Sequence, residues 1–171
     1  YGLYQPDEGQ IFINEQPVHF QSSKDSIAHK IGMVHQHFML IPKLTVAENI
    51  VVGQEPGSRL KVDRAGAEKR IRELSEKYGL KIDPHAKVAD LSVTEQQRVE
   101  ILKILYREAE ILIFDEPTAV LTPQEIDEFC DILLGLKASG KTILFISHKM
   151  AEVMKISDHI TVIRRGKVIG T

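Results

Sequence analysis

The sequence predicts an α/β fold organised around a parallel sheet. Two short apolar segments, "ILIF" at residues 111–114 and "TILFI" at 142–146, have no polar face. This is the composition of parallel strands that are covered by helices on both sides. The segment between them opens with a capping box at Thr122–Glu125 and predicts a helix that reaches Ser139–Gly140. A strand, a helix and a second strand in this order indicate a parallel βαβ arrangement, so both strands are expected to be buried.

Composition limits the classes of function. A chain of 171 residues that is 43% hydrophobic is long enough for one domain with a substantial core. Lysine and arginine (22) nearly balance aspartate and glutamate (24), and no basic block argues for a nucleic-acid or anionic membrane surface. The single cysteine, Cys130, cannot form an internal disulfide, which fits a reducing compartment. No apolar run approaches the ~18 residues that a membrane helix needs, so a role at a membrane would require a docking partner.

The first third of the chain is predicted to be mainly β. "GQIFIN" and "PVHF" flank Glu15–Gln16 and predict a hairpin. "IGMV" at 31–34 predicts another short strand, followed by a polar break.

The middle of the chain is predicted to be helical, and the helix starts are marked by capping boxes. The boxes pair Thr45 with Glu48, Ser92 with Glu95, and Thr122 with Glu125, the last with Pro123 in the first turn. A further helix is expected to begin near Asp63 and end at Gly79, and a short one follows at 149–157. The chain then closes with a hairpin that turns at Arg165–Gly166.

Asp115 and Glu116 follow the first apolar strand directly. Ligands of parallel sheets bind where the strands end, and successive strand residues point to opposite sides. An aspartate there suits a metal ion, bound directly or through water, and the next glutamate can polarise a water molecule. The alternative is that both carboxylates only cap or orient the following turn.

Three other segments reach the same region of the predicted sheet or offer an anion site. His148 follows the second apolar strand and could donate to a phosphate, although a histidine there is often structural. Gln36 follows the 31–34 strand and could supply a carbonyl to a cation or water, or be a plain turn residue. "LSVTEQQR" (91–98) is an N-capped helix start, and such a helix end is also an anion site.

Together these motifs, in this order, resemble the nucleotide-binding domain of ATP-binding-cassette (ABC) proteins. The resemblance covers nearly the whole chain. It implies a P-loop NTPase-like α/β fold with a parallel core sheet and antiparallel hairpins. The α/β core would consist of residues 1–44 and 108–171, and a helical subdomain of about 45–107. The wording of "GMVHQHFMLIPKLTVAENI" and "DEPTAVLTPQE" is similar to the first cassette of double-cassette importers for simple sugars and nucleosides.

The resemblance implies a task for each matching residue. Gln36 corresponds to the Q-loop glutamine, which senses the metal and water, and Asp115 to the Walker B aspartate, which holds Mg²⁺ partly through water. Glu116 corresponds to the catalytic glutamate and His148 to the switch histidine. The signature motif, which grips the phosphate held by a second cassette, corresponds to Leu91, Ser92, Val93, Thr94 and Glu95, and the D-loop to Ala119, Val120, Leu121 and Thr122.

The function implied is ATP hydrolysis with Mg²⁺, coupled to import of a solute. The implied partners are transmembrane permease subunits, a second cassette and a solute-binding protein, with no nucleic acid. The implied location is the cytoplasmic face of the cell membrane. Two alternatives stay open: an ABC-type ATPase of non-transport function, and a non-catalytic interaction module. The long coiled coils, zinc modules or basic arms of the former are not seen in this sequence.

Three departures from the family pattern stand out. Thr94 replaces the glycine expected in the signature motif, where it could obstruct a phosphate or turn its methyl away and leave its hydroxyl as a donor; we favour the second. Thr122 replaces the usual D-loop aspartate. The phosphate loop, G-x-x-x-x-G-K-[ST], is inferred to be absent from this sequence. By resemblance it would lie before Tyr1, as expected for a domain truncated at its N-terminus. We therefore expect the chain alone to bind ATP–Mg²⁺ poorly and, with a sheet edge exposed, to self-associate.

Overall fold

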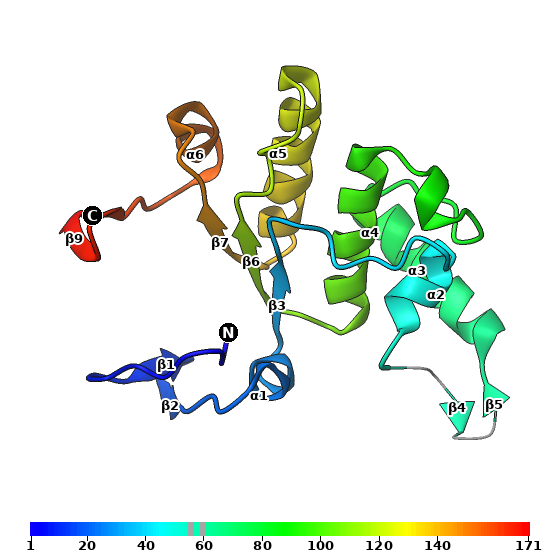
Figure 1. The fold of residues 1–171 in the computed structure, drawn as a ribbon, viewed down its shortest axis with the longest axis horizontal. Helices are drawn as coiled ribbons and strands as arrows, with labels where there is room; N and C mark the ends of the chain where they lie inside the picture. The colour runs from blue at the N-terminus through cyan, green and yellow to red at the C-terminus, as the bar shows by residue number, and fades with distance from the viewer. Residues whose placement is uncertain (55–56, 59–60) are drawn as a thin grey trace.

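The computed structural model describes residues 1–54, 57–58 and 61–171. Its centre is a parallel sheet of three strands, β3 (Ile31–Val34), β6 (Ile111–Asp115) and β7 (Thr142–Ile146), with β6 in the middle. The three strands point the same way (Figure 1). Ile111 is level with both Ile31 and Thr142, so the strands start together and end within one residue of one another. The predicted α/β class is confirmed.

Helices pack against this sheet and provide most of the core. Helix α4 (Val93–Tyr106) packs against β3, α5 (Pro123–Ala138) packs against β7, and α6 (Met150–Ile156) packs against α5. In β6, Leu112 and Phe114 are fully buried, and the Phe114 ring meets Phe129 of α5 edge to face at 5.7 Å between centroids. The hydrophobic effect thus fixes β6 between the helices.

Three helices form a group beside the sheet (Figure 1). They are α2 (Val46–Val51), α3 (Arg64–Lys77) and α4, and they pack on one another through fully buried side chains such as Ile50, Ile71 and Val99. A 3₁₀ turn at Val88–Asp90 precedes α4. All three predicted capping boxes are present, and Asp63 caps α3 as expected. Residues 55–56 and 59–60 of the predicted helical segment 45–107 lie outside the described residues.

Three hairpins and one more helix complete the described chain. The hairpins are β1 (Ile11–Ile13) with β2 (Gln16–Val18), β4 (Gly57–Ser58) with β5 (Lys61–Val62), and β8 (Val162–Arg164) with β9 (Lys167–Gly170). The first turns at Asn14–Glu15, both at positive φ, one residue before the predicted Glu15–Gln16. The sequence did not reveal the β4–β5 hairpin or α1 (Ser23–Ala28), a six-residue helix with one large apolar residue. No described helix has the length and apolar character needed to cross a bilayer.

The prediction that β7 is a buried strand is wrong for one of its faces. Leu144 and Ile146 are 53% and 47% exposed, whereas Ile143 and Phe145 are half-buried. The reason lies in the layers: Thr142, Leu144 and Ile146 point to one face of β7, and the described residues leave that face exposed, whereas α5 packs against the strand. An apolar sequence cannot by itself show whether both faces of a strand are covered.

Close packing of β3 on α4 depends on Gly32. A Cβ atom at this position would lie 2.7 Å from the Ile104 Cβ and 3.0 Å from the Ala109 Cβ, and both are fixed to backbone. We expect Gly32→Ala to lower the free energy of unfolding in urea by about 1–3 kcal/mol, because the methyl group has no room. The matched control is Gly135→Ala at an exposed position of helix α5, where a Cβ meets nothing within 4 Å; it should raise stability by about 0.5–1 kcal/mol. An unchanged stability of Gly32→Ala would contradict this packing.

Candidate functional site

The three parallel strands deliver the candidate residues to one edge of the sheet. Because β3, β6 and β7 end together, the residues that follow them, Gln36, Glu116 and His148, emerge at this carboxyl edge. Asp115 is the last residue of β6 itself. The fold therefore collects at one edge side chains that are up to 112 positions apart (36 to 148) in the sequence.

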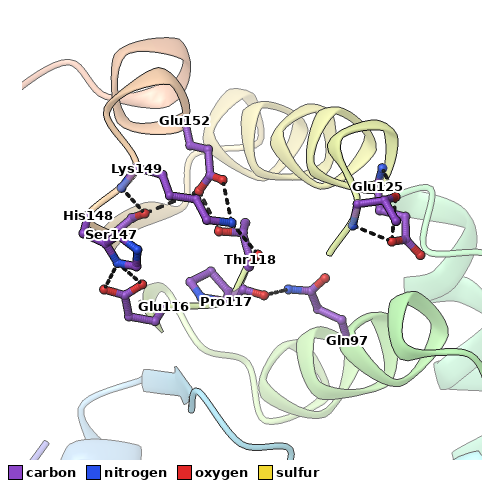
Figure 2. A network of polar contacts seen from close by, with 10 residues as sticks. Gln97, Glu116, Pro117, Thr118, Glu125, Ser147, His148, Lys149 and Glu152 are labelled. Atoms are coloured by element: carbon purple, nitrogen blue, oxygen red, sulfur yellow. Dashed lines mark hydrogen bonds and ion pairs between the residues drawn. The ribbon is translucent and has the colours of Figure 1, made fainter. Parts of the chain in front are cut away.

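Glu116 and His148 are in direct contact (Figure 2). The Nδ1 atom of His148 lies 2.9 Å from the Glu116 carboxylate. The Glu116 backbone N–H donates to the Ile146 carbonyl at 3.0 Å, which ties the end of β6 to the end of β7. Glu116 also has φ +48°, a left-handed conformation that costs a non-glycine residue on the order of 1 kcal/mol. The Glu116 side chain is 23% exposed and His148 is 74% exposed, so the pair is reachable from solvent.

Asp115 and Gln36 have no such contact. The half-buried Asp115 carboxylate has no hydrogen-bond or ion-pair partner among the described residues, and neither has the exposed Gln36 side chain. No group of three or more described histidine, cysteine, aspartate or glutamate residues could hold a metal ion. A Mg²⁺ ion is usually held by one or two carboxylates together with substrate phosphates and water. The residues present fit that binding mode and not a metal cage.

The segment after Glu116 is fixed by residues that the sequence did not reveal as relevant (Figure 2). Gln97 of α4 and Lys149, before α6, each donate to its backbone, and the buried Glu152 of α6 accepts from Thr118. The one available signal was a glutamate among the apolar residues of "AEVMKI", four positions after His148.

The signature-like segment begins α4 and is partly occupied by its own contacts. The Ser92 hydroxyl donates to Glu95 at 2.8 Å and accepts from the Glu95 backbone N–H. The backbone N–H of Ser92, with its hydroxyl, lowers the pKa of the Glu95 carboxyl. The Thr94 hydroxyl donates to Glu125 of α5. Thr94 therefore directs its hydroxyl at the neighbouring helix.

The Ala119–Thr122 segment connects β6 to α5. Val120 is 66% exposed, whereas Leu121 is buried in the core. Thr122 caps α5 and shares the Glu125 carboxylate with Thr94. One glutamate thus links the start of α4 to the end of the segment that matches the D-loop.

The inferred absence of the phosphate-loop pattern needs a correction. The letters G-x-x-x-x-G-K-T do occur, from Gly135 to Thr142. A phosphate loop runs from a strand into a helix N-terminus, where free N–H groups bind the anion. These residues run the other way, from the end of α5 into β7, with Gly140 at φ +86° and the Lys141 ammonium on the Ala109 carbonyl. The match has the wrong structural context and lies at the opposite end of the strands from Asp115.

Residues 1–119 match the model of the ABC transporter family. The chain belongs to this family. Among curated proteins, it is 53% identical to a guanosine import ATP-binding protein of Bacillus subtilis and 51% identical to a nucleoside import ATP-binding protein of Lactococcus lactis. It is 43% identical to a ribose import ATP-binding protein of Rubrobacter xylanophilus. These matches cover 99–100% of the chain and 34% of each relative, so the chain spans about a third of their length.

Solved structures support the same fold. A protein of Clostridium perfringens, described as part of the ABC transporter complex cbiONQ, superposes with a TM-score of 0.82 at 27% identity. The match covers 98% of this chain and 67% of that one. The fold is therefore that of an ABC ATP-binding cassette.

The contact between Thr94 and Glu125 makes a prediction about protonation. The Thr94 hydroxyl is the largest of the influences that lower the pKa of Glu125, ahead of the Thr122 N–H and hydroxyl. We expect Thr94→Val to raise the Glu125 pKa towards its ordinary value, as read from an NMR pH titration of the carboxyl carbon. A lowered pKa stabilises the fold at pH values above the ordinary glutamate pKa, and this stabilisation is lost as the pH falls. The free energy of unfolding of Thr94→Val should therefore decrease less between neutral and acid pH than that of the wild type. Thr142→Val, an exposed threonine on β7, is the control; an unmoved Glu125 pKa in Thr94→Val would contradict the contact.

Proposed function

We propose that this chain is part of the ATP-hydrolysing subunit of an importer whose solute is a nucleoside or a simple sugar. The observation that carries the proposal is the contact of Glu116 with His148 beside an unpaired Asp115. A carboxylate that orients water, a histidine that faces phosphate and a free aspartate are the groups that phosphoryl transfer needs. The curated relatives, whose names describe nucleoside and ribose import, support the choice of solute class.

In this proposal Glu116 positions and polarises the attacking water. With His148 Nδ1 engaged by Glu116, the other ring nitrogen, Nε2, is left to face the γ-phosphate of ATP. A protonated imidazole donates from both nitrogens, so His148 can hold the carboxylate and steady the phosphate together. The left-handed backbone conformation of Glu116 is consistent with a catalytic role, because strained backbone conformations are concentrated at active sites.

Asp115 and Gln36 are proposed to hold Mg²⁺, partly through water. When bound, the ion neutralises charge that develops on the phosphate oxygens. The unpaired Asp115 carboxylate and exposed Gln36 amide have no competing contacts among the described residues.

The remaining parts of the proposal concern assembly. Leu91–Glu95 would face the nucleotide of a second cassette, with Ala119–Thr122 at the contact between the two. The helical subdomain at about 45–107 and the Gln36 loop would contact transmembrane permease subunits on the cytoplasmic side. A solute-binding protein would deliver the solute to these permease subunits. We propose that the phosphate loop that cradles ATP lies outside these 171 residues.

The test is Glu116→Gln in the native protein that contains this chain, assembled with its transport partners. The ATPase rate should fall about 10²–10⁴-fold, the usual scale of a general base, while ATP still binds. Glu8→Gln, an exposed glutamate before β1 and outside the 45–107 subdomain, makes the same chemical change away from the site and should leave the rate unchanged. If Glu116→Gln hydrolyses ATP at the wild-type rate, Glu116 is a turn residue and the proposed function is wrong.

A further inference from the structure

The backbone that follows Asp115 is anchored from three sides (Figure 2). The Glu116 N–H is held by the end of β7, as described above. The Pro117 carbonyl accepts from Gln97 Nε2 at 2.8 Å, and the Thr118 carbonyl accepts from Lys149 Nζ at 2.7 Å. Gln97 is 1% exposed, so its contact is made inside the core. Three successive residues are thus attached to α4, to β7 and to the segment that begins α6.

The side chain of Thr118 makes the most buried of these contacts. Thr118 is fully buried, and its hydroxyl donates to Glu152 Oε2 at 2.6 Å. Glu152, in α6, is only 5% exposed. Burying a carboxylate is costly unless it is paired and hydrogen-bonded. The Thr118 hydroxyl is hydrogen-bonded to Oε2 of Glu152, and the Lys149 ammonium lies 3.4 Å from Oε1 as an ion pair, while Oε1 has no hydrogen-bond partner among the described residues.

Glu152 also reaches the turn that carries His148. The Ser147 hydroxyl donates to Glu152 Oε2 at 3.4 Å, and the Lys149 backbone N–H donates to the Ser147 hydroxyl at 3.1 Å. The two residues on either side of His148 are therefore attached to the same carboxylate as Thr118. Because Glu116 is two residues before Thr118, one buried group fixes the segments that carry both members of the Glu116–His148 pair.

We propose that Glu152 and Thr118 are positioning residues that hold Glu116 and His148 in register for ATP hydrolysis, and that they also set the start of the Ala119–Thr122 segment. This rests on the proposed function, but the contact itself is independent of it. Neither residue touches the substrate in this proposal; both act through the backbone that they anchor. Movement of the His148 turn would accordingly be transmitted to Ala119–Thr122 through the Thr118 hydroxyl.

Two substitutions at Thr118 separate positioning from packing. Thr118→Ser keeps the hydroxyl and removes a methyl group from a fully buried site. Thr118→Val keeps the volume and removes the donor to Glu152. If the residue only fills space, serine should be the more harmful change; if the hydroxyl positions the loop, valine should be. The control for α6 is Asp127→Asn, which removes an exposed ion pair with Lys155 that also joins α5 to α6.

The kinetic experiment compares these variants in the native protein that contains this chain. We expect Thr118→Val to lower kcat about tenfold with KM for ATP unchanged within about twofold, and Thr118→Ser and Asp127→Asn to stay near wild type. A lower kcat for serine than for valine, or wild-type kcat in both, would overturn the proposal.

A second experiment on the native protein that contains this chain needs no ATPase activity. Amide hydrogen exchange of residues 116–122 should be about tenfold faster in Thr118→Val than in Thr118→Ser, with Asp127→Asn unchanged. Equal exchange in the two Thr118 variants would overturn the proposal. If the wild-type native protein hydrolyses no ATP, the proposed function fails, and the exchange experiment alone decides whether Thr118 and Glu152 position the loop.

Discussion

Parallel pairing of β6 with β3 on one side and β7 on the other is the constraint on which the rest of the site depends. The register makes the three strands end level, and this alone places Gln36, Asp115–Glu116 and His148 at one edge. Buried apolar packing of Phe114 on α5 and of Gly32 against α4 holds the strands in that register. The polar contacts at the edge then refine positions that the hydrophobic core has already set.

The helix starts and the parallel arrangement of β6 and β7 were predicted correctly from the sequence, whereas α1, the exposed face of β7 and the contacts of the loop after β6 were not. The capping boxes at Thr45, Ser92 and Thr122 are contained within four residues, and all three form. The exposed face of β7 depends on which elements pack on each face of the sheet, and the Thr118–Glu152 contact joins residues 34 apart. The G-x-x-x-x-G-K-T letters at Gly135–Thr142 give the converse case: a pattern is present, but its polarity relative to the helix is reversed. Order of motifs along the whole chain was therefore more informative than any one of them.

Carboxylates link the candidate site across elements. Glu116 joins β6 to the turn after β7, Glu152 joins α6 to the loop after β6, and Glu125 joins α5 to the start of α4 through Thr94. Thr94, which stands where the resemblance leads us to expect a glycine, thus has a structural partner in Glu125. In all three cases a charged acceptor meets a donor from another element, and such bonds are stronger than those between neutral groups.

The most direct measurement is a crystal structure of the native protein that contains this chain, bound to Mg²⁺ and a non-hydrolysable ATP analogue. The γ-phosphate should lie at the carboxyl edge of the sheet, within hydrogen-bond reach of His148 Nε2, with Glu116 facing the position of the attacking water. The metal should lie beside Asp115 and Gln36. An analogue bound elsewhere, with Asp115, Glu116 and His148 contacting neither phosphate nor metal, would contradict the assignment of this edge as the nucleotide site.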